Sequence, residues 1–481
     1  MLRYRQFAYG CLDQDIKTLF LGHHLADQVE TIILRLYRGQ RVASAGLSGM
    51  KPVHSIPCCR GIFGASDGSE TSSLPRLMGH STPLLTTENR DRLSAPSPVI
   101  EGGSFPGGIH VSHGGIRTYR PLLSFAKSRL IATCEANSIP FVNDPSNFDP
   151  KTAPRNAVRW LLSNDKMPRA LRQDSIVRLG AAATKLGQSL DKKLTALMNA
   201  TLLVHFDIRS GRLMVLVPKD ITKTYNANEQ EASYYVDHLL RLVSPHEEIT
   251  ESAFRRVAIA RTMFPELLDA ASFKSDRSID TNSFTVRGVL IEPSQGFSDR
   301  LWVMSRRPFR ALEDHQSTFV PAPFYSKGTD RDWSRWIAWD ARYWIRIRTR
   351  NPEDVRNFQV RALRPADMAV LNAERERLPV QSRQALRTLG GAAPGRTRYT
   401  LPVLVKGSQA RVLPTFDLEF PSESTDEKGA GSAVLTEELQ WEVRYKDITD
   451  TLQYLKRSAS NGDGLAKPTS LDNLPASSFH I

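Results

Sequence analysis

The sequence contains few cysteines and no long apolar run. Its 481 residues include four cysteines, none of them spaced Cys-x-x-Cys as in common zinc and iron–sulfur sites. We therefore expect no metal site and a reducing compartment. No stretch approaches the roughly 20 apolar residues that cross a bilayer, and the first residues lack the apolar core of a signal peptide, so we expect a water-soluble chain. The cysteines are Cys11, Cys58, Cys59 and Cys134.

Acidic residues are outnumbered by basic ones. The chain has 64 Lys and Arg against 51 Asp and Glu, a formal charge of +13. Such an excess concentrates a polyanion such as RNA by releasing counterions. Many ordinary basic proteins share this balance, so the charge alone does not identify the partner.

The apolar pattern divides the chain into regions of different type. Strand and helix patterns alternate near the N-terminus, and a stretch rich in Gly, Ser, Pro and Thr interrupts them. Later come helical spacings with one hairpin signal, then a strand-rich part and a polar tail. The predicted regions are an α/β domain at 1–59 and 116–165, a disordered insertion at 60–115, a helical region with a hairpin at 166–275, a strand-rich α+β region at 283–447 and a disordered tail at 458–481.

An acidic cluster follows the first predicted strand, Thr18–Leu21, where a predicted helix begins. His23, Asp27 and Glu30 are three or four residues apart, so a helix places them on one face near its N-terminus. Carboxylates beside an imidazole can bind an amine and take its proton. The alternative is a helix cap whose charges complement the dipole. A zinc site is a weaker alternative, because no second ligand cluster appears.

A second basic pattern occurs in a predicted strand near the C-terminus. Arg346, Arg348 and Arg350 alternate with Ile345 and Ile347, so the three arginines share one face. That face is either solvated or faces RNA, and the pattern favours neither.

The acidic segment is part of a longer motif. His-His-Leu-x-Asp-Gln-x-Glu-Thr from His23, then Leu-x-Arg-Gly and Gly-Leu-x-x-Met, resembles the central motif of tRNA(Ile)-lysidine synthases, N-type ATP pyrophosphatases of the PP-loop family. The Arg-Pro-Leu-Leu at Arg120, the Asp-Pro-Ser-Asn at Asp144 and the Arg-Asn-x-x-Arg at Arg155 follow in the family's order. The resemblance covers about residues 3–162. Arg364–Asp367 and Leu401–Leu404 are similar, more loosely, to fungal members.

The resemblance implies a fold and an activity. The fold is an incomplete doubly wound, adenine-nucleotide alpha hydrolase-like parallel sheet, followed by a helical arm and an α+β region. The activity joins lysine to the wobble cytidine of an isoleucine tRNA with a CAU anticodon, using ATP with Mg²⁺ and releasing AMP and pyrophosphate. A eukaryotic member is expected in mitochondria, otherwise in the cytoplasm. The implied catalytic residues are His23, Asp27 and Glu30, and the implied substrate- or phosphate-binding residues are Arg155, Asn156, Arg159 and Arg38.

One family element is not found in the 481 residues. The Ser-Gly-Gly-x-Asp-Ser loop, whose backbone amides hold the ATP phosphates, has no counterpart. We therefore expect that an N-terminal segment precedes this chain in a complete enzyme. The alternative is a catalytically inactive tRNA-binding remnant. A tRNA-thiolating relative is disfavoured, because no cysteines are suitably spaced for that chemistry.

Overall fold

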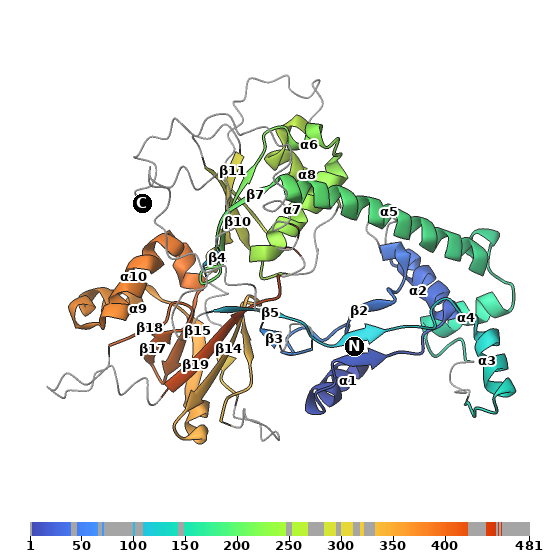
Figure 1. The fold of residues 1–481 in the computed structure, drawn as a ribbon, viewed down its shortest axis with the longest axis horizontal. Helices are drawn as coiled ribbons and strands as arrows, with labels where there is room; N and C mark the ends of the chain where they lie inside the picture. Colours follow the sequence, from blue (N-terminus) through green and yellow to red (C-terminus); the bar gives the residue numbers. More distant parts are fainter. Residues whose placement is uncertain are drawn as a thin grey trace. The chain divides into compact units, whose positions relative to one another are not determined.

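The computed structural model contains two compact units, which are considered separately. The first comprises residues 1–66 and 115–194, and the second comprises residues 67–114 and 195–481. Figure 1 labels the elements of both units. The structure describes residues 2–39, 46–65, 70–71, 100–101, 109–142, 149–246, 253–267, 283–294, 300–310, 318–321, 332–421, 439–448, 451 and 454.

The first unit is built on a small mixed sheet with helices around it. Its strand order is β1-β6-β2, with β1 parallel and β2 antiparallel to β6. Its strands are β1 (Thr18–Phe20), β2 (Val53–Ser55) and β6 (Arg117–Tyr119). Its helices are α1 (Leu2–Asp13), α2 (Leu25–Tyr37), η2 (Gly46–Ser48), α3 (Lys127–Ala136), α4 (Pro154–Ser163), η5 (Arg169–Leu171) and the larger part of α5 (Gln173–Ala200).

The predicted elements of this unit agree with the structure at their centres and differ at their ends. The strand predicted at Thr18–Leu21 is β1, and the helix predicted at Ala26–Tyr37 is α2. In the predicted α/β stretch 116–165, strand β6 ends at Tyr119, because Pro121 has no N–H to donate and the chain turns there. Local periodicity therefore located the elements, while turn geometry set their bounds.

Helix α2 is held by an apolar stripe. Val29, Ile32 and Ile33 are buried at the helical spacing and pack in one cluster with Ile176 and Ala183 of α5. A fully buried side chain of this size contributes about 2 kcal/mol. This packing fixes the orientation of α2. The direction in which the polar residues of its opposite face point is therefore fixed as well.

Among the residues that the structure describes, the second unit contains three sheets. Their strand orders are β4-β7-β8-β11-β10-β9, β12-β15-β16-β17-β18 and β13-β14-β19-β5-β3. The strands are β3 (Glu70–Thr71), β4 (Ile100–Glu101), β5 (His110–His113), β7 (Leu202–Asp207), β8 (Arg212–Val217), β9 (Phe284–Val286), β10 (Val289–Ser294), β11 (Arg300–Arg306), β12 (Thr318–Phe319), β13 (Ile337–Trp339), β14 (Tyr343–Thr349), β15 (Phe358–Ala362), β16 (Pro402–Lys406), β17 (Gln409–Leu413), β18 (Leu418–Glu419) and β19 (Leu439–Tyr445).

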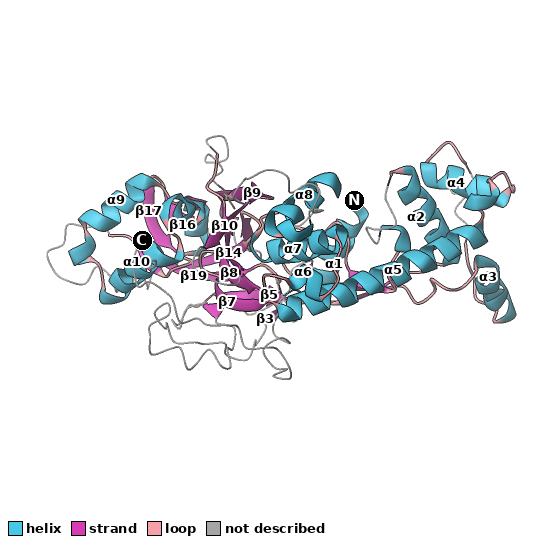
Figure 2. Cartoon of the chain, turned by 90° about the horizontal axis from the view of Figure 1, so that it is seen from above, coloured by secondary structure: helices cyan, strands magenta, loops and turns pink. Residues whose placement is uncertain are grey.

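Helices cover parts of these sheets. Helices α9 and α10 pack against the sheet that contains β16 and β17, sharing one apolar cluster with it (Figure 2). The helices of this unit are α6 (Ile221–Thr224), α7 (Glu229–Val243), α8 (Ala253–Met263), η6 (Pro265–Leu267), η8 (Pro352–Asn357), α9 (Pro365–Ala373), η9 (Arg375–Arg377), α10 (Val380–Ala392) and η10 (Gly395–Thr400). None of the described helices has both the length and the apolar character needed to span a bilayer.

The predicted hairpin is present, but it lies within a larger sheet. Strands β7 and β8 pair antiparallel around Gly211, whose φ of +70° suits glycine and whose added Cβ would meet the Arg342 guanidinium at 2.9 Å. Strand β8 also pairs with β11, which comes from the predicted region 283–447. The sequence placed the hairpin in a helical region, because pairing with a strand far along the chain leaves no local signal.

Part of the predicted insertion at 60–115 has regular structure. His110–His113 form β5, which pairs parallel with β19 and antiparallel with β3. Composition did not indicate this strand, because its partner lies more than 300 residues away along the chain. Most of 66–108, the Asp-Pro-Ser-Asn motif at Asp144 and the predicted tail at 458–481 lie outside the described residues.

Candidate active site at the start of α2

Two parallel strands of the first unit end at the same edge. The Leu21 amide donates to the Tyr119 carbonyl at 2.8 Å, extending the pairing of β1 with β6. The Leu25 amide, at the start of α2, donates to the Phe125 carbonyl at 3.0 Å. The chain after β6 therefore lies against the N-terminus of α2. Ligands of α/β sheets gather at this kind of edge, where a helix N-terminus also favours an anion.

Asp27 lies in the first turn of α2 and caps it. Its Oδ2 accepts from the His24 amide at 3.0 Å, and its side chain is 15% exposed. The predicted helix-cap role of this carboxylate is thus present in the geometry. The same side chain also contacts the next helix, so capping does not account for all of its interactions.

Two arginines of α4 reach the acidic face of α2. Arg155 donates from Nε to Glu30 Oε2 at 2.6 Å and from Nη2 to Asp27 Oδ1 at 2.9 Å. Arg159, one turn later, donates from Nε to Glu30 Oε1 at 2.8 Å and from Nη2 to Glu30 Oε2 at 3.1 Å. Pro154 occupies the first turn of α4, where its missing N–H costs nothing. The two arginines are four residues apart and therefore share a helix face.

The two carboxylates of the cluster differ in what they can do. Glu30 is 1% exposed and accepts hydrogen bonds from both guanidiniums, which neutralise its charge. The hydrogen bond with Glu30 in turn raises the pKa of Arg159. Glu30 is suited to fixing the arginines, whereas Asp27 is the more accessible carboxylate. An incoming cation would therefore meet Asp27.

His23 lies at the same edge as a neutral imidazole. Burial lowers its pKa below the usual 6.5; the charge of Asp27 opposes this shift, and those of Arg120, Arg155 and His24 add to it. Its Nδ1 is buried and has no hydrogen-bond partner among the described residues. A neutral ring with a free nitrogen can accept a proton near neutral pH.

A pocket of about 340 Å³ lies beside the cluster. Glu30 and Arg159 line one part of it, and Asp165, Arg172 and Asp174 line another. Asp165 and Arg172 pair at 3.2 Å, with their side chains 74% and 53% exposed. The pocket thus offers charges of both signs, which is what the ammonium and carboxylate groups of an amino acid require. In the same described ranges, no group of three or more His, Cys, Asp and Glu side chains is arranged to hold a metal ion.

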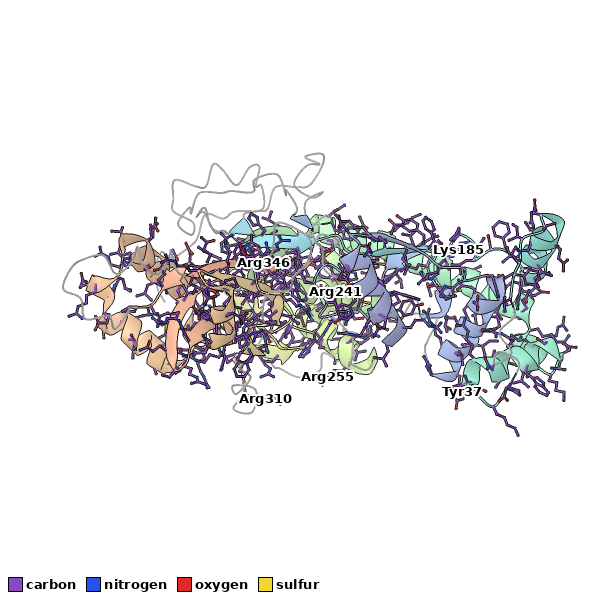
Figure 3. The ribbon with its side chains drawn as sticks, turned by 90° about the horizontal axis from the view of Figure 1, so that it is seen from below. Tyr37, Lys185, Arg241, Arg255, Arg310 and Arg346 are labelled. Carbon is purple, nitrogen blue, oxygen red and sulfur yellow. The ribbon has the colours of Figure 1, made fainter. Side chains whose placement is uncertain are left out.

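The structure separates the remaining predicted site residues from this cluster. Arg38 is the C-cap of α2, about 16 Å along the axis from Asp27 at roughly 1.5 Å per residue. The neighbouring Tyr37 is 87% exposed (Figure 3). The Asn156 side chain donates to the Asp149 carbonyl at 3.1 Å and so stabilises the turn before α4.

Sequence reasoning did not select Arg120, which lies at the same edge. It follows β6 directly, is 7% exposed, and donates from Nη1 to the Lys51 carbonyl at 3.1 Å. Its Nε is buried without a hydrogen-bond partner in the described part of the chain. Arg120 could have been predicted as a site residue, because it directly follows a strand parallel to β1 and such strands end at the edge where ligands bind.

The motif residue Gln28 and its helix neighbour Arg35 explain the Gly-Leu-x-x-Met string. The Gln28 amide exchanges hydrogen bonds with the Met50 backbone at 2.7 and 3.0 Å. Arg35 donates to the carbonyls of Gly46 and Gly49 at 2.6 and 2.7 Å, and burial lowers its pKa. The string therefore serves to attach η2 to α2.

The predicted arginine stripe on β14 has the expected alternation. Ile345 and Ile347 are fully buried, Arg346 and Arg348 are half-buried, and Arg350 is exposed beyond the end of the strand. The two-residue period is therefore confirmed. Whether the arginines bind RNA stays a prediction.

The stripe is engaged within its own sheet. Arg346 pairs with Glu442 of β19 at 2.7 Å, and its guanidinium lies 4.7 Å from the ring centres of both Trp333 and Trp336. The Arg348 guanidinium lies 5.2 Å from the Trp333 ring. Such cation–π contacts stabilise the face and reduce the charge offered to a ligand.

Comparison with known proteins follows the same division of the chain. Residues 1–66 and 105–165 match the family model described as a PP-loop domain, and these ranges include α2 and α4. The chain is 24% identical over 425 residues to a probable tRNA(Ile)-lysidine synthase of Schizosaccharomyces pombe, covering 88% of this chain and 73% of that protein.

Two bacterial proteins are similar over a shorter range. A tRNA(Ile)-lysidine synthase of Methylobacterium nodulans is 26% identical over 151 residues, 31% of this chain and 27% of that protein. One of Anaplasma marginale is 23% identical over 167 residues, 35% of this chain and 23% of that protein. The chain therefore matches about a quarter of each bacterial protein.

Proposed function

We propose that the chain is an ATP-dependent carbon–nitrogen ligase that joins lysine to the wobble cytidine of an isoleucine tRNA, because residues 1–66 and 105–165 match the PP-loop domain and the chain is similar to tRNA(Ile)-lysidine synthases. The observation that carries the proposal is the cluster of Asp27 with Arg155, Glu30 and Arg159. This cluster lies at the edge where parallel strands end, beside a pocket lined by both signs of charge.

The residues of the cluster have different roles in the reaction of lysine. Asp27 receives the side-chain ammonium, since it is the accessible carboxylate. His23 takes the proton that the amine must lose before its nitrogen can attack, because its ring is neutral and its Nδ1 is free. Glu30 holds Arg155 and Arg159 in place, so Glu30 is a positioning residue in this scheme.

Cationic groups at the same edge fit a phosphate-bearing substrate. ATP supplies the adenylyl group that activates the C2 oxygen of cytidine. Arg120 has a buried Nε without a partner among the described residues, and Arg155 is 38% exposed, so both can donate to phosphate oxygens. We propose that a magnesium ion accompanies the ATP phosphates.

Lysine incorporation tests the proposal directly. The complete gene product is incubated with ATP, labelled lysine and an isoleucine tRNA transcript with a CAU anticodon, and the label on the RNA is counted. We expect incorporation that needs all three substrates, and Asp27→Ala should abolish it while tRNA binding persists. Asp13→Ala, an exposed carboxylate at the end of α1, is the matched control. Full activity of Asp27→Ala would remove the site.

The alternative of an inactive tRNA-binding protein predicts a different result in the same experiment. The unmodified chain would then bind the tRNA with no bound ATP and no incorporated lysine. The basic charge of the chain is compatible with this alternative. Equilibrium dialysis with labelled ATP separates the two, since the ligase requires ATP binding.

The compartment is also part of the proposal. We propose a mitochondrial protein, or otherwise a cytoplasmic one, as the resemblance to eukaryotic tRNA(Ile)-lysidine synthases implies. A fluorescent fusion of the complete gene product would locate it, and a signal in neither compartment would refute this point.

A further inference from the structure

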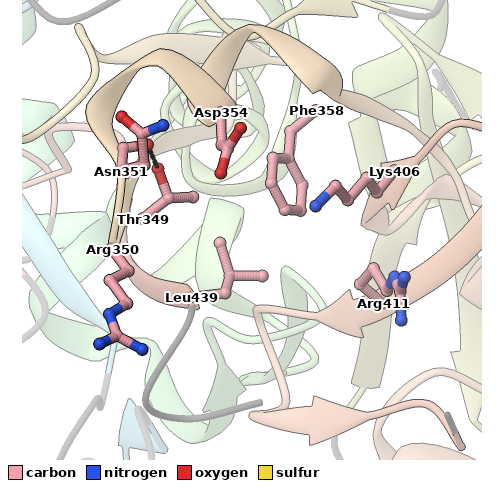
Figure 4. Close-up of a pocket in the computed structure, with 8 residues that line it drawn as sticks. All are labelled: Thr349, Arg350, Asn351, Asp354, Phe358, Lys406, Arg411 and Leu439. Atoms are coloured by element: carbon pink, nitrogen blue, oxygen red, sulfur yellow. Dashed lines mark hydrogen bonds between the residues drawn. The ribbon is translucent and has the colours of Figure 1, made fainter. Parts of the chain in front are cut away.

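A second pocket lies in the second unit, far along the chain from the α2 cluster. Its volume is about 220 Å³, and it is bounded by the end of β14, the helix η8, strands β16 and β17 and the start of β19 (Figure 4). Its lining residues are Thr349, Arg350, Asn351, Asp354, Phe358, Lys406, Arg411 and Leu439.

The charge of this pocket is positive. Arg350, Lys406 and Arg411 line it together with one carboxylate, Asp354. Among the described residues, no carboxylate forms an ion pair with any of the three cations, and the buried Nε of Arg411 has no hydrogen-bond partner. In the stripe on β14, by contrast, Arg346 is already paired. The pocket therefore has unused capacity for an anion.

The rest of the lining differs in chemistry from the cations. Phe358 and Leu439, each 4% exposed, form an apolar wall, and the Lys406 ammonium lies 5.7 Å from the Phe358 ring centre (Figure 4). Asp354 and Asn351 lie on the η8 side; the Asn351 oxygen caps η8 by accepting from the Glu353 amide at 3.3 Å, whereas the Asp354 oxygens can accept from hydroxyl or amino groups. An inorganic anion would leave the apolar wall and these acceptors unused.

We propose that this pocket binds a nucleoside phosphate, with the phosphate at Arg350, Lys406 and Arg411 and the sugar or base against the apolar wall and Asp354. A nucleotide combines an anion, a flat apolar surface and hydrogen-bond donors, and each matches one part of the lining. The pocket is smaller than the roughly 300–1,000 Å³ of sites that enclose whole ligands. It accordingly suits one unstacked nucleotide of a longer strand better than a free nucleotide.

The inference rests on the proposed function, since an RNA substrate would bring the nucleotide. It adds a binding site in the second unit that the α2 cluster does not require. Arg350 then has a role distinct from that of Arg346 and Arg348, because it serves the pocket and not the paired stripe.

Binding of RNA to the full chain tests the site. A fluorescent single-stranded oligonucleotide of mixed sequence is titrated by anisotropy against the wild type and the variant Arg350→Gln/Lys406→Gln, both of whose changes are at exposed side chains. The control is Arg375→Gln/Arg377→Gln, which removes the same charge from exposed positions on η9. Uridine 5′-monophosphate is titrated by calorimetry against the same proteins.

We expect the pocket variant to bind RNA more weakly and with a smaller salt dependence than the control. At about 0.7 per phosphate contact, loss of one or two contacts lowers the slope of log K against log salt by about 0.7 to 1.4 and weakens binding roughly four- to fourteenfold at about 0.15 M salt. Pocket-dependent binding of uridine monophosphate without RNA binding would support the nucleotide chemistry with a free nucleotide as its source.

Equal RNA affinity and salt slope in the pocket and control variants would overturn the inference, as would a wild type that binds neither probe. The ligase proposal has a separate readout. Pocket-dependent RNA binding without lysine incorporation would support the nucleotide site and contradict the ligase proposal. Lysine incorporation together with unchanged RNA binding in the pocket variant would support the ligase and contradict the nucleotide site.

Discussion

Replacing Glu30 with glutamine should loosen α2 and α4 together. Glu30 is 1% exposed, and its two oxygens accept from Arg155 at 2.6 Å and from Arg159 at 2.8 and 3.1 Å. Glutamine keeps the shape, but it turns its NH₂ group toward a guanidinium donor and removes the negative charge. Breaking a buried ion pair costs about 3–5 kcal/mol. The Arg155 and Arg159 side chains are 38% and 32% exposed, so hydration of their guanidiniums offsets part of this cost. We expect the free energy of unfolding to fall by about 2 kcal/mol.

The matched substitution is Asp27→Asn on the same helix face. Asparagine retains the oxygen that caps the His24 amide, and the partner Arg155 is partly exposed, so the expected cost is below about 1 kcal/mol. The two variants should differ in stability, but both should lose activity. Asp27→Asn should lose lysine incorporation with little loss of stability, while Glu30→Gln should lose both.

Native-state hydrogen exchange resolves the local effect. Peptides covering α2 and α4 should exchange about 30-fold faster in Glu30→Gln than in the wild type, because about 1.4 kcal/mol corresponds to a factor of ten. Peptides of α7, in the second unit, serve as the internal reference. Unchanged protection of both helices, or a greater loss in Asp27→Asn than in Glu30→Gln, would refute the assignment of Glu30 as the anchor.

Two further predictions concern stability. Burial, with the nearby charges of Arg241 and Arg287, lowers the pKa of His238 from 6.5 to about 4. The unfolded chain therefore binds a proton that the folded one does not between these values, so stability should fall by roughly 2 kcal/mol from about pH 7 to about pH 5 in urea titrations. His238→Gln should abolish that component, and an unchanged pH slope would contradict it. Gly49→Ala places a side chain at a φ of +76° and within 2.6 Å of Gln28, so it should lower the unfolding temperature by a few degrees, at a cost of about 1–2 kcal/mol; an unaltered melting curve would show that η2 is not held as described.

Elements with a local signal could be predicted from the sequence. β1, α2, the β7–β8 hairpin and the alternation along β14 follow from periods of two and 3.6 residues. The common helix face of Asp27 and Glu30 follows in the same way, since it depends only on their spacing. The ends of these elements were less predictable, because turns and caps set them.

The partners of those residues could not be obtained from any local pattern. Arg155 meets Glu30 across 125 residues of sequence, and β5 meets β19 across a still longer separation. The sequence indicated that both arginines belong to a motif, but not that both pair with Glu30 while only Arg155 pairs with Asp27.

By itself, therefore, the sequence determined which side chains share a helix or strand face, because backbone geometry repeats over a few residues. The tertiary structure decided which of them are consumed by internal pairs and which remain available. Arg346 faces Glu442 and two tryptophans, whereas Arg411, equally basic in the sequence, retains a buried Nε without a hydrogen-bond partner in the described chain. Burial and pairing depend on residues brought close only by folding, and they set what each charge can bind.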